Sequence, residues 1–458
     1  MTDDRPLRVL VTGATGYIGA RLAPRLVEAG HQVRVLVRDP DKICDVPWVA
    51  DVQVFRGDLL QPDTLDDAFA DVDVLYYLVH SMSSHGGFLD KETRSATNVA
   101  EAAKRAGVRR IVYLGGLHAE SRQLSTHLRS RTQVGQILID SGVPTMVLQA
   151  GVVIGSGSAS FEMIRHLTNR LPVMTTPRWV NNHIQPIAVR DVLYYLIAAA
   201  TADLPASRTY DIGGPDVLRY GEMMQIYAEV AGLARRRILV LPVLTPKLAG
   251  LWIDLVTPVP GNIGRALIES LSTDAVAKEH DIDAVIAPPP GGPTDYRQAV
   301  ALALRHSADG EVESTWTTTP ATVAPSDPLP SDPDWAGEIV YTDNRTAQCA
   351  GTVEQTWATL HSRVATATPG TFPVGPGRNQ RHIDRSTDNS VLRVRIAGRA
   401  PGGAWLEWTL QPDGDDRTTV RQRAIYFPKG LAGQAYWYAT RQLQRKALET
   451  ELRRLITT

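Results

Sequence analysis

One stretch decides the fold of this 458-residue chain: Thr12-Gly13-Ala14-Thr15-Gly16-Tyr17-Ile18-Gly19. It follows an apolar run at residues 7–11 and opens a segment, residues 17–29, whose apolar side chains recur at helical spacing. A strand, a glycine turn and a helix in this order predict a turn that binds a dinucleotide, with the pyrophosphate at the N-terminus of the helix. The predicted cofactor contacts in this turn are Gly13, Thr15, Gly16, Tyr17, Ile18 and Gly19.

Each glycine of the turn has a separate predicted role. Gly13 allows the tight turn, Gly16 lets the pyrophosphate approach the backbone, and Gly19 lets the helix pack closely on the strand. A glycine triplet alone is a weak signal, because ordinary turns also use glycine. The alternative is a structural turn without a ligand, and the surrounding strand–helix–strand pattern argues against it.

The residue after the second predicted strand, residues 32–37, indicates which nicotinamide cofactor binds. NAD enzymes usually place an acidic side chain here to accept a hydrogen bond from the ribose 2′-OH. This chain has Arg38, whose guanidinium suits a 2′-phosphate. The alternative is that Arg38 is only a solvated charge beside Asp39. We expect NADP(H) to be preferred over NAD(H).

Strands and helices alternate over the first 150 residues. Further strands are predicted at residues 52–55, 74–79, 110–114 and 145–148, with helices at 63–70, 87–106 and 123–141 between them. This alternation predicts an α/β fold with a doubly wound parallel sheet. Ligands of such sheets lie at the carboxyl ends of the strands, which adds Asp58 and residues 78–82 and 115–117 to the predicted site.

The rest of the chain divides into three parts. Residues 151–306 are predicted to form a smaller α/β lobe on the substrate side, and residues 307–335 have the composition of a linker. In residues 336–458, strands at 391–396, 404–410 and 418–427 precede a long helix at 432–456, with a shorter helix at 353–364. This pattern predicts an α+β helix-grip domain with an apolar cavity for a hydrophobic ligand. The alternative is that Trp405, Trp408 and Trp437 are ordinary core residues.

Composition excludes several classes of protein. The net charge is −1, from 48 basic and 49 acidic residues, so no global field attracts nucleic acid or an anionic membrane. Cys44 and Cys349 have no spacing typical of a metal site or a disulfide framework, which fits a cytoplasmic protein. The first residues do not resemble a signal peptide, and prolines and charges interrupt the apolar residues 239–259, which disfavours a transmembrane segment. A surface-seeking segment there, in peripheral contact with a membrane, stays open, as does the oligomeric state.

The first 300 residues resemble the atypical, NmrA-like short-chain dehydrogenases/reductases, which have a Rossmann fold and bind NADP(H). The resemblance rests on the glycine turn, Arg38-Asp39-Pro40 and Gly57-Asp58-Leu59. It implies that Asp58 lies beside the adenine and that Leu59, Leu78, Val79 and His80 line the cofactor. The alternative for Asp58 is a turn or helix cap.

Other segments resemble a bacterial subgroup in which a START-like domain of unknown function follows the reductase-like part. They are Tyr77-Leu78-Val79-His80-Ser81-Met82, Tyr113-Leu114-Gly115-Gly116-Leu117, His127-Leu128-Arg129-Ser130-Arg131 and residues 155–162, with 426–433 and 436–438 in the second domain. This second domain is short compared with its relatives, because most of the tryptophan- and glycine-rich section expected between Thr356 and Arg393 is missing. Its cavity is therefore expected to be reduced or lost.

The catalytic residues depart from the family pattern. A standard short-chain reductase uses Tyr-x-x-x-Lys, in which the lysine lowers the tyrosine pKa. Here His127 occupies the tyrosine position and Arg131 the lysine position, and residues 115–117 replace the usual serine neighbourhood.

Three substitutes for the missing acid are open. His127 is a candidate general acid whose neutral form Arg131 favours, against the alternative of a helix-surface histidine. His80 or Ser81 is a candidate to protonate or orient a substrate, against a loop-capping role. Arg131 is alternatively a ligand of the cofactor ribose or phosphate.

Two main functions follow from this pattern. The first is an NADPH-dependent oxidoreductase that acts on an apolar small molecule with a non-standard proton donor. The second is a non-catalytic NADP(H) sensor whose C-terminal domain binds a lipid or a partner. A third, cofactor-retaining isomerisation, rests only on Tyr210-Asp211-Ile212-Gly213-Gly214-Pro215. The missing acid favours the sensor, whereas the intact cofactor site and the full second lobe favour the enzyme.

Overall fold

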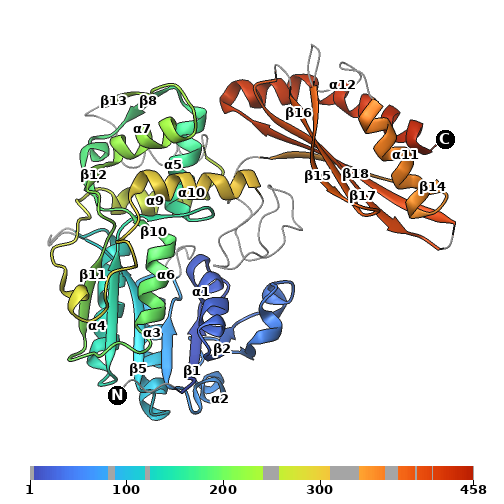
Figure 1. Ribbon diagram of the computed structural model, residues 1–458. Helices are drawn as coiled ribbons and strands as arrows, with labels where there is room; N and C mark the ends of the chain where they lie inside the picture. Colours follow the sequence, from blue (N-terminus) through green and yellow to red (C-terminus); the bar gives the residue numbers. More distant parts are fainter. Residues whose placement is uncertain are drawn as a thin grey trace. The chain divides into compact units, whose positions relative to one another are not determined.

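The computed structural model describes residues 5–80, 88–118, 124–240, 257–309, 340–366, 380–397, 400–414 and 416–456. These residues fold into two compact units, one drawn from residues 5–168 and 172–309 and the other from residues 169–171 and 340–456 (Figure 1). Each unit has its own buried apolar core. The two units are therefore described one at a time.

A parallel sheet of seven strands forms the centre of the first unit. Its strands, in spatial order, are β11 (Arg208–Ile212), β6 (Thr145–Ala150), β5 (Arg110–Gly116), β4 (Val74–Tyr77), β1 (Arg8–Thr12), β2 (Gln32–Val37) and β3 (Gln53–Arg56). Every neighbouring pair is parallel. The strand order reverses between β1 and β4, which is the switch point where such sheets bind ligands. This confirms the predicted doubly wound α/β fold.

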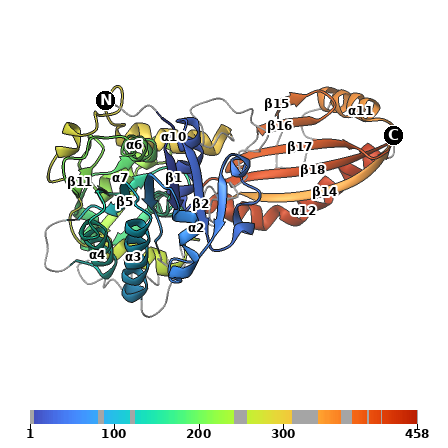
Figure 2. The ribbon, with the colours of Figure 1, turned by 90° about the horizontal axis from the view of Figure 1, so that it is seen from below.

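Helices cover both faces of this sheet because both faces are apolar. Alternate residues of β1 contribute to different cores: Val9 and Val11 to one, and Leu10 to the other. Helices α1 (Tyr17–Glu28) and α6 (Val189–Ala198) pack on the first face. Helices α2 (Asp66–Phe69), α3 (Phe88–Arg105) and α4 (Thr126–Asp140) pack on the second, with α3 and α4 side by side (Figure 2).

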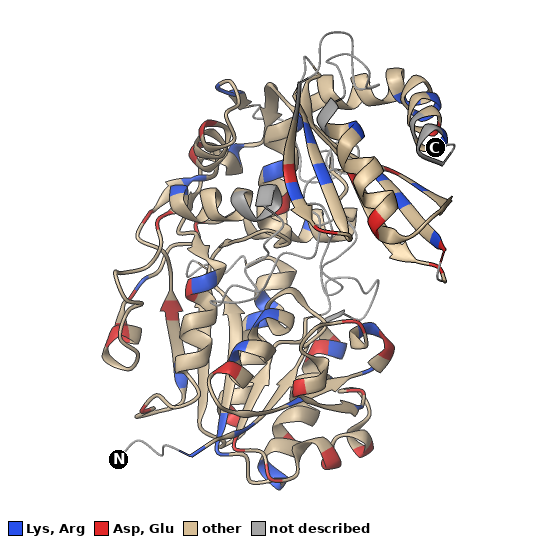
Figure 3. Ribbon diagram, turned by 45° about the vertical axis from the view of Figure 1, so that its right-hand side comes forward, with Lys and Arg blue, Asp and Glu red and all other residues tan. Residues whose placement is uncertain are grey.

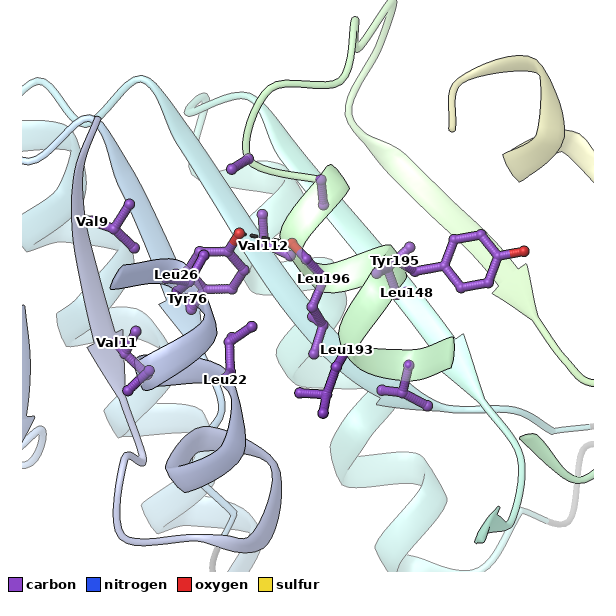
Figure 4. Packing of buried hydrophobic residues seen from close by; sticks show 14 of the residues in the cluster. Val9, Val11, Leu22, Leu26, Tyr76, Val112, Leu148, Leu193, Tyr195 and Leu196 are labelled. Carbon is purple, nitrogen blue, oxygen red and sulfur yellow. Dashed lines mark hydrogen bonds between the residues drawn. The ribbon is translucent and has the colours of Figure 1, made fainter. Parts of the chain in front are cut away.

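Figure 4 shows how the first face is filled. Leu22 and Leu26 of α1 and Leu193 of α6 lie among the valines of the sheet, fully shielded from solvent. The hydroxyl of Tyr76 donates a hydrogen bond of 2.7 Å to the carbonyl oxygen of Leu196. Burial of one such leucine stabilises the fold by about 1.5–3 kcal/mol. These contacts hold β1 and β4, and hence the segments that follow them, in fixed positions.

Smaller elements complete the first unit. The strands are β7 (Val153–Ile154), β8 (Val173–Thr176), β9 (His183–Ile184), β10 (Ile187–Ala188), β12 (Leu218–Arg219) and β13 (Arg237–Val240), paired as β10–β7, β12–β9 and β13–β8. The helices are α5 (Ala159–Arg170), α7 (Tyr220–Val230), α9 (Gly261–Ser270) and α10 (Tyr296–Asp309), with 3₁₀ turns at Pro40–Ile43, Val49–Asp51, Pro62–Thr64, Arg178–Asn181 and Asp281–Ala284. Helix α10 includes the first three residues of the predicted linker, 307–309.

No helix in the described ranges is long and apolar enough to cross a membrane. Most of the apolar segment 239–259, namely residues 241–256, lies outside the described residues. Both basic and acidic residues occur on the elements of both units (Figure 3). The expected absence of a nucleic-acid partner stays a prediction.

The second unit is an antiparallel sheet with two helices. Its strands, in spatial order, are β14 (Tyr341–Ala350), β18 (Arg417–Pro428), β17 (Gly402–Pro412), β16 (Val391–Ala397) and β15 (Gln380–Thr387), and its helices are α11 (Val353–Thr366) and α12 (Gly430–Ile456). Three of these strands and both helices were predicted. β14 and β15 were not, because their sequences are mainly polar and show little apolar alternation. The relation to START-like domains stays a prediction.

Tryptophans fill the core of the second unit. Trp408 is fully buried, and the ring of Trp437 stacks on the rings of Tyr341 and Tyr426, with centroids 5.1 and 5.6 Å away. These positions favour the interpretation of the tryptophans as core residues. A small apolar hollow remains between the sheet and α12, lined in part by Trp405, Tyr426 and Trp437.

Candidate active site

The glycine turn links β1 to α1 and is packed against the end of β4. Gly13 has a φ of +80°, and a Cβ atom on it would lie 2.6 Å from the carbonyl oxygen of Leu78. A Cβ on Gly19 would lie 2.3 Å from the carbonyl oxygen of Gly13. Both positions are therefore closed to any side chain. Because Gly13 contacts the peptide between Leu78 and Val79, these two predicted cofactor residues lie beside the turn.

Gly16 differs from the other two glycines. Its φ of −89° and ψ of 167° are extended values that any residue adopts, and a Cβ would meet only the carbonyl oxygen of Gly13, at 3.2 Å. The fold itself does not need a glycine here. What the missing side chain does is leave the N-terminus of α1 open.

The N-terminus of α1 is suited to an anion. No side-chain cap and no acidic residue is found in its first turn, so its N–H groups can donate to a phosphate. Thr15 and Gly16 are exposed at this point, and Ile18 is half-buried. The guanidinium of Arg21 lies over the ring of Tyr17, 4.0 Å from its centroid, and the Tyr17 hydroxyl lies next to Gly155. The predicted pyrophosphate site therefore has the backbone geometry that a dinucleotide requires.

Arg38 and Asp58 lie at the carboxyl ends of β2 and β3. Arg38 is exposed and forms no ion pair with any described acidic residue, Asp39 included. Asp58 is half-buried, and its Oδ1 accepts a hydrogen bond of 3.0 Å from the N–H of Leu60. The Asp58 side chain therefore caps this turn, which was the alternative to adenine binding in the sequence analysis. Leu59 is buried, and its carbonyl accepts a hydrogen bond from Asn98.

Two predicted proton donors meet at the end of β4. His80 follows β4, and His127 lies in the first turn of α4, whose N-cap Ser125 accepts a hydrogen bond from the N–H of Leu128. The Nε2 atoms of the two histidines are 3.2 Å apart, and their ring centroids are 4.5 Å apart. His127 is half-buried, so it is not a helix-surface histidine. Ser81, the third predicted donor, lies outside the described residues.

Two charged residues flank the histidine pair. An oxygen of Glu92 in α3 lies 3.6 Å from Nδ1 of His80, and the Glu92 side chain is 3% exposed. Arg131 lies one helical turn after His127 and packs on the end of β5, where a Cβ on Gly116 would be 3.4 Å from the Arg131 Cδ. We call His80, Glu92, His127 and Arg131 the histidine cluster.

The cluster keeps its imidazoles neutral. Burial, and next the charge of Arg131, lower the pKa of His80 well below its ordinary value. The same two causes, together with His80, lower the pKa of His127 to about 2, although the Glu92 carboxylate acts in the opposite direction. Both rings are therefore uncharged at neutral pH. The direction in which Arg131 acts agrees with the sequence-based expectation.

Two tyrosines border the cluster and are not suited to act as acids. Tyr77 and Tyr113 pack edge to face with centroids 5.8 Å apart. Burial raises the pKa of Tyr113 to about 12 and that of Tyr77 well above its ordinary value. The Tyr113 hydroxyl donates to the carbonyl of Arg131 at 3.3 Å.

Some buried polar atoms beside the cluster lack a partner. Among the described residues, the Tyr77 hydroxyl, the Ser130 hydroxyl and Nε of Arg131 make no hydrogen bond. Unpaired polar atoms in a buried site cost free energy unless a ligand or water pairs with them. This favours a polar ligand group at the carboxyl ends of β4 and β5.

Glu92 is the member of the cluster that was not predicted from the sequence. It lies on the same face of α3 as the buried residues Ala96, Val99 and Ala103. A carboxylate on the apolar face of an amphipathic helix is the feature of the sequence from which Glu92 could have been predicted.

Comparison with known proteins agrees with this geometry. The sequence pattern described as NAD(P)H-binding matches residues 13–151. The first unit has a Rossmann-type parallel sheet, and its residues 13–151 match the NAD(P)H-binding class. Its glycine turn, sheet order and open helix N-terminus are those of this class.

Two curated relatives of the chain are bacterial reductases. The (4-alkanoyl-5-oxo-2,5-dihydrofuran-3-yl)methyl phosphate reductase of Streptomyces griseus is 28% identical over 231 residues, which cover 49% of this chain and 74% of the relative. The ceramide reductase of Caulobacter vibrioides is 29% identical over 285 residues, which cover 60% of this chain and 86% of the relative.

Solved structures show the same fold. The triphenylmethane reductase of Citrobacter sp., solved in complex with NADP(H), is 20% identical with a TM-score of 0.51, covering 64% of this chain and 99% of that one. The NADPH-dependent quinone oxidoreductase of Escherichia coli, solved with NADPH, is 19% identical with a TM-score of 0.51, covering 64% of this chain and 98% of that one.

Proposed function

We propose that the first unit is an NADP(H)-dependent reductase of apolar carbonyl, enone or quinone compounds. In this proposal the His80–His127 pair replaces the standard tyrosine–lysine pair. The observation that carries it is the 3.2 Å approach of the two Nε2 atoms at the carboxyl end of β4, next to the glycine turn. Two histidines separated by 47 residues in sequence meet where a reductase needs its proton donor.

The residues present fit the dinucleotide. The N-terminus of α1 would hold the pyrophosphate, Arg38 the 2′-phosphate, and Asp58 the adenine amine through the oxygen that does not accept from Leu60. Leu78 and Val79 would line the nicotinamide end. When bound, the reduced nicotinamide supplies a hydride. The remaining task of the chain is to deliver one proton to the substrate oxygen.

The proton must come from the histidine pair or through it. The high pKa of Tyr77 and Tyr113 makes them poor proton donors. A neutral imidazole can accept a proton at one nitrogen while it donates from the other. The names of the two curated relatives, both reductases, support hydride transfer as the type of reaction.

A second candidate function is an NADP(H) sensor without catalysis. It is favoured by the neutral state of both histidines, which leaves no charged acid in the cluster at neutral pH. In this alternative, the oxidation state of the cofactor would alter lipid or partner binding by the second unit, whose apolar hollow is small.

Stopped-flow oxidation of NADPH distinguishes the two candidates. The full chain is mixed with NADPH and a panel of carbonyl, enone and quinone compounds. For a reductase we expect substrate-dependent oxidation, and in His80→Ala/His127→Gln a turnover lowered by roughly 10²–10⁴ with NADPH affinity within about twofold. His183→Gln, an exposed histidine of the same unit, is the matched control.

Each possible failure has a distinct meaning. If no compound in the panel is reduced, and lipid or partner binding changes when NADP⁺ replaces NADPH, the sensor is correct. If oxidation is rapid and persists in the double variant, the histidine pair is not the donor.

A further inference from the structure

Three titratable side chains form a continuous chain in the first unit. The Glu92 carboxylate lies 3.6 Å from Nδ1 of His80, and Nε2 of His80 lies 3.2 Å from Nε2 of His127. The three residues come from α3, the segment after β4, and α4. Glu92 is almost completely buried, and the His80 side chain is 14% exposed. A buried carboxylate aligned with two imidazoles is an expensive arrangement unless it has a role.

The positions of the protons follow from these contacts. Because a carboxylate oxygen accepts hydrogen bonds, the 3.6 Å contact with Glu92 favours the tautomer of His80 that has its hydrogen on Nδ1. A neutral imidazole has one N–H, which leaves a lone pair on Nε2 of His80. The contact between the two Nε2 atoms then requires His127 to donate, so the lone pair of His127 is on Nδ1.

We propose that Glu92 is a positioning residue, which fixes the tautomers of both histidines and neutralises one extra proton that the pair carries to the substrate. This inference rests on the proposed reductase function. In the loaded state, His80 bears hydrogens on both nitrogens and His127 bears one on Nδ1. The extra proton is on Nε2 of His80, and the Glu92 carboxylate beside Nδ1 of the same ring provides the compensating negative charge.

The transfer step balances in protons and electrons. As the carbonyl carbon of the substrate accepts the hydride, the π electron pair of the C=O bond moves to the oxygen. The oxygen takes the proton from Nδ1 of His127, and Nε2 of His127 takes the proton from Nε2 of His80. The pair is left neutral, with the tautomers of the resting structure. Its next proton comes from water.

The groups around the pair set how readily it is loaded. Burial lowers the pKa of both histidines, and so does the positive charge of Arg131 on α4; both effects therefore disfavour binding of the extra proton. Tyr77 on β4 and Tyr113 on β5 face Glu92 as neutral hydroxyls, because burial raises the pKa of both. Glu92 is therefore the acidic side chain within the described cluster that favours loading.

Two substitutions separate the charge of Glu92 from its positioning effect. Glu92→Gln keeps the size and an acceptor oxygen but removes the charge. Because a nearby opposite charge shifts a pKa by about 1–3 units, we expect the reduction rate at a given pH to fall roughly 10- to 1000-fold. Glu92→Leu removes the acceptor as well, so the tautomer of His80 should also become mixed. Glu101→Gln, an exposed residue of the same helix, is the control.

The test uses the full chain labelled with ¹⁵N-histidine. Long-range ¹H–¹⁵N NMR at neutral pH reports the tautomer of each ring without any substrate. We expect His80 to be protonated at Nδ1 and His127 at Nε2 in the wild type and in Glu92→Gln, and His80 to lose this preference in Glu92→Leu. NADPH affinity should be within about twofold of wild type in every variant.

Two outcomes overturn the inference. One is His80 protonated at Nε2 in the wild type, and the other is an unchanged His80 tautomer in Glu92→Leu. If the tautomers are as expected but no compound in the panel is reduced, the reductase function fails while the positioning by Glu92 stands. A reductase whose rate is unaffected in Glu92→Gln would show that the carboxylate charge has no part in proton delivery.

Discussion

The glycine turn and the histidine cluster lie at the ends of neighbouring strands, β1 and β4, yet they are built in opposite ways. The turn is formed by consecutive residues. Its glycines have no side chains to block a ligand, and backbone N–H groups at the N-terminus of α1 can donate to a phosphate. The cluster comes from three separate elements and works through side chains that touch. The predicted cofactor site thus depends on local sequence, whereas the proposed proton transfer depends on tertiary placement.

The largest expected effect concerns the turn. We expect Gly16→Val to abolish measurable NADPH binding in calorimetry, because the branched side chain would cover the N-terminus of α1. The thermal unfolding midpoint should change less than in Gly19→Val, since the backbone of Gly16 is extended and its Cβ would meet one carbonyl oxygen, at 3.2 Å.

Gly19→Val is the comparison variant within the same turn. Its Cβ would overlap the carbonyl of Gly13, so it should destabilise the fold by about 1–3 kcal/mol. If Gly16→Val binds NADPH as the wild type does, the turn does not hold the pyrophosphate.

The second effect concerns the end of β2. Arg38→Asp should weaken NADPH binding by about 1.5–3 kcal/mol, which is the contribution of a charge-assisted hydrogen bond, and should leave NADH binding almost unchanged. The ratio of the two dissociation constants from calorimetry measures this. Arg56→Asp, an exposed arginine at the end of β3, is the control. Equal affinities for the two cofactors in the wild type would remove Arg38 from this role.

The smallest effect concerns two adjacent tyrosines of β4. Tyr76→Phe should lower the free energy of unfolding by about 1 kcal/mol or more, because it leaves the carbonyl of Leu196 without its partner. Tyr77→Phe should not lower it, because the Tyr77 hydroxyl makes no hydrogen bond among the described residues. Urea unfolding of both variants measures the difference. An equal loss in both would mean that Tyr77 has a partner in the free protein.

The sequence was sufficient for the parts that depend on local pattern. The apolar run at residues 7–11, the glycine turn and the alternation of strands and helices after it predicted the parallel sheet. The structure then buries Val9 and Val11 on one face of the sheet and Leu10 on the other. In contrast, β14 and β15 escaped prediction because their side chains are mainly polar.

The candidate site was predictable only in part. His80 was identified from its position after the fourth predicted strand, and His127 from its place in the family's Tyr-x-x-x-Lys pattern, but nothing in the sequence indicates that they touch. Their contact depends on how α4 packs beside β5 and on the path of the chain after β4. Glu92 was missed for the same reason, because its contact with His80 exists only when α3 packs beside the end of β4.

The central claim is that a neutral histidine pair handles the proton, and the pH dependence of a single turnover tests it most directly. The loaded pair carries its extra proton on His80, whose pKa burial and Arg131 lower well below its ordinary value, so from pH 7 upward the loaded pair is a small fraction that falls about tenfold with each added pH unit. The rate of reduction should fall by the same factor, while oxidation of the product alcohol, which needs only the neutral pair as base, should be constant. A reduction rate that is constant over this range would contradict the account.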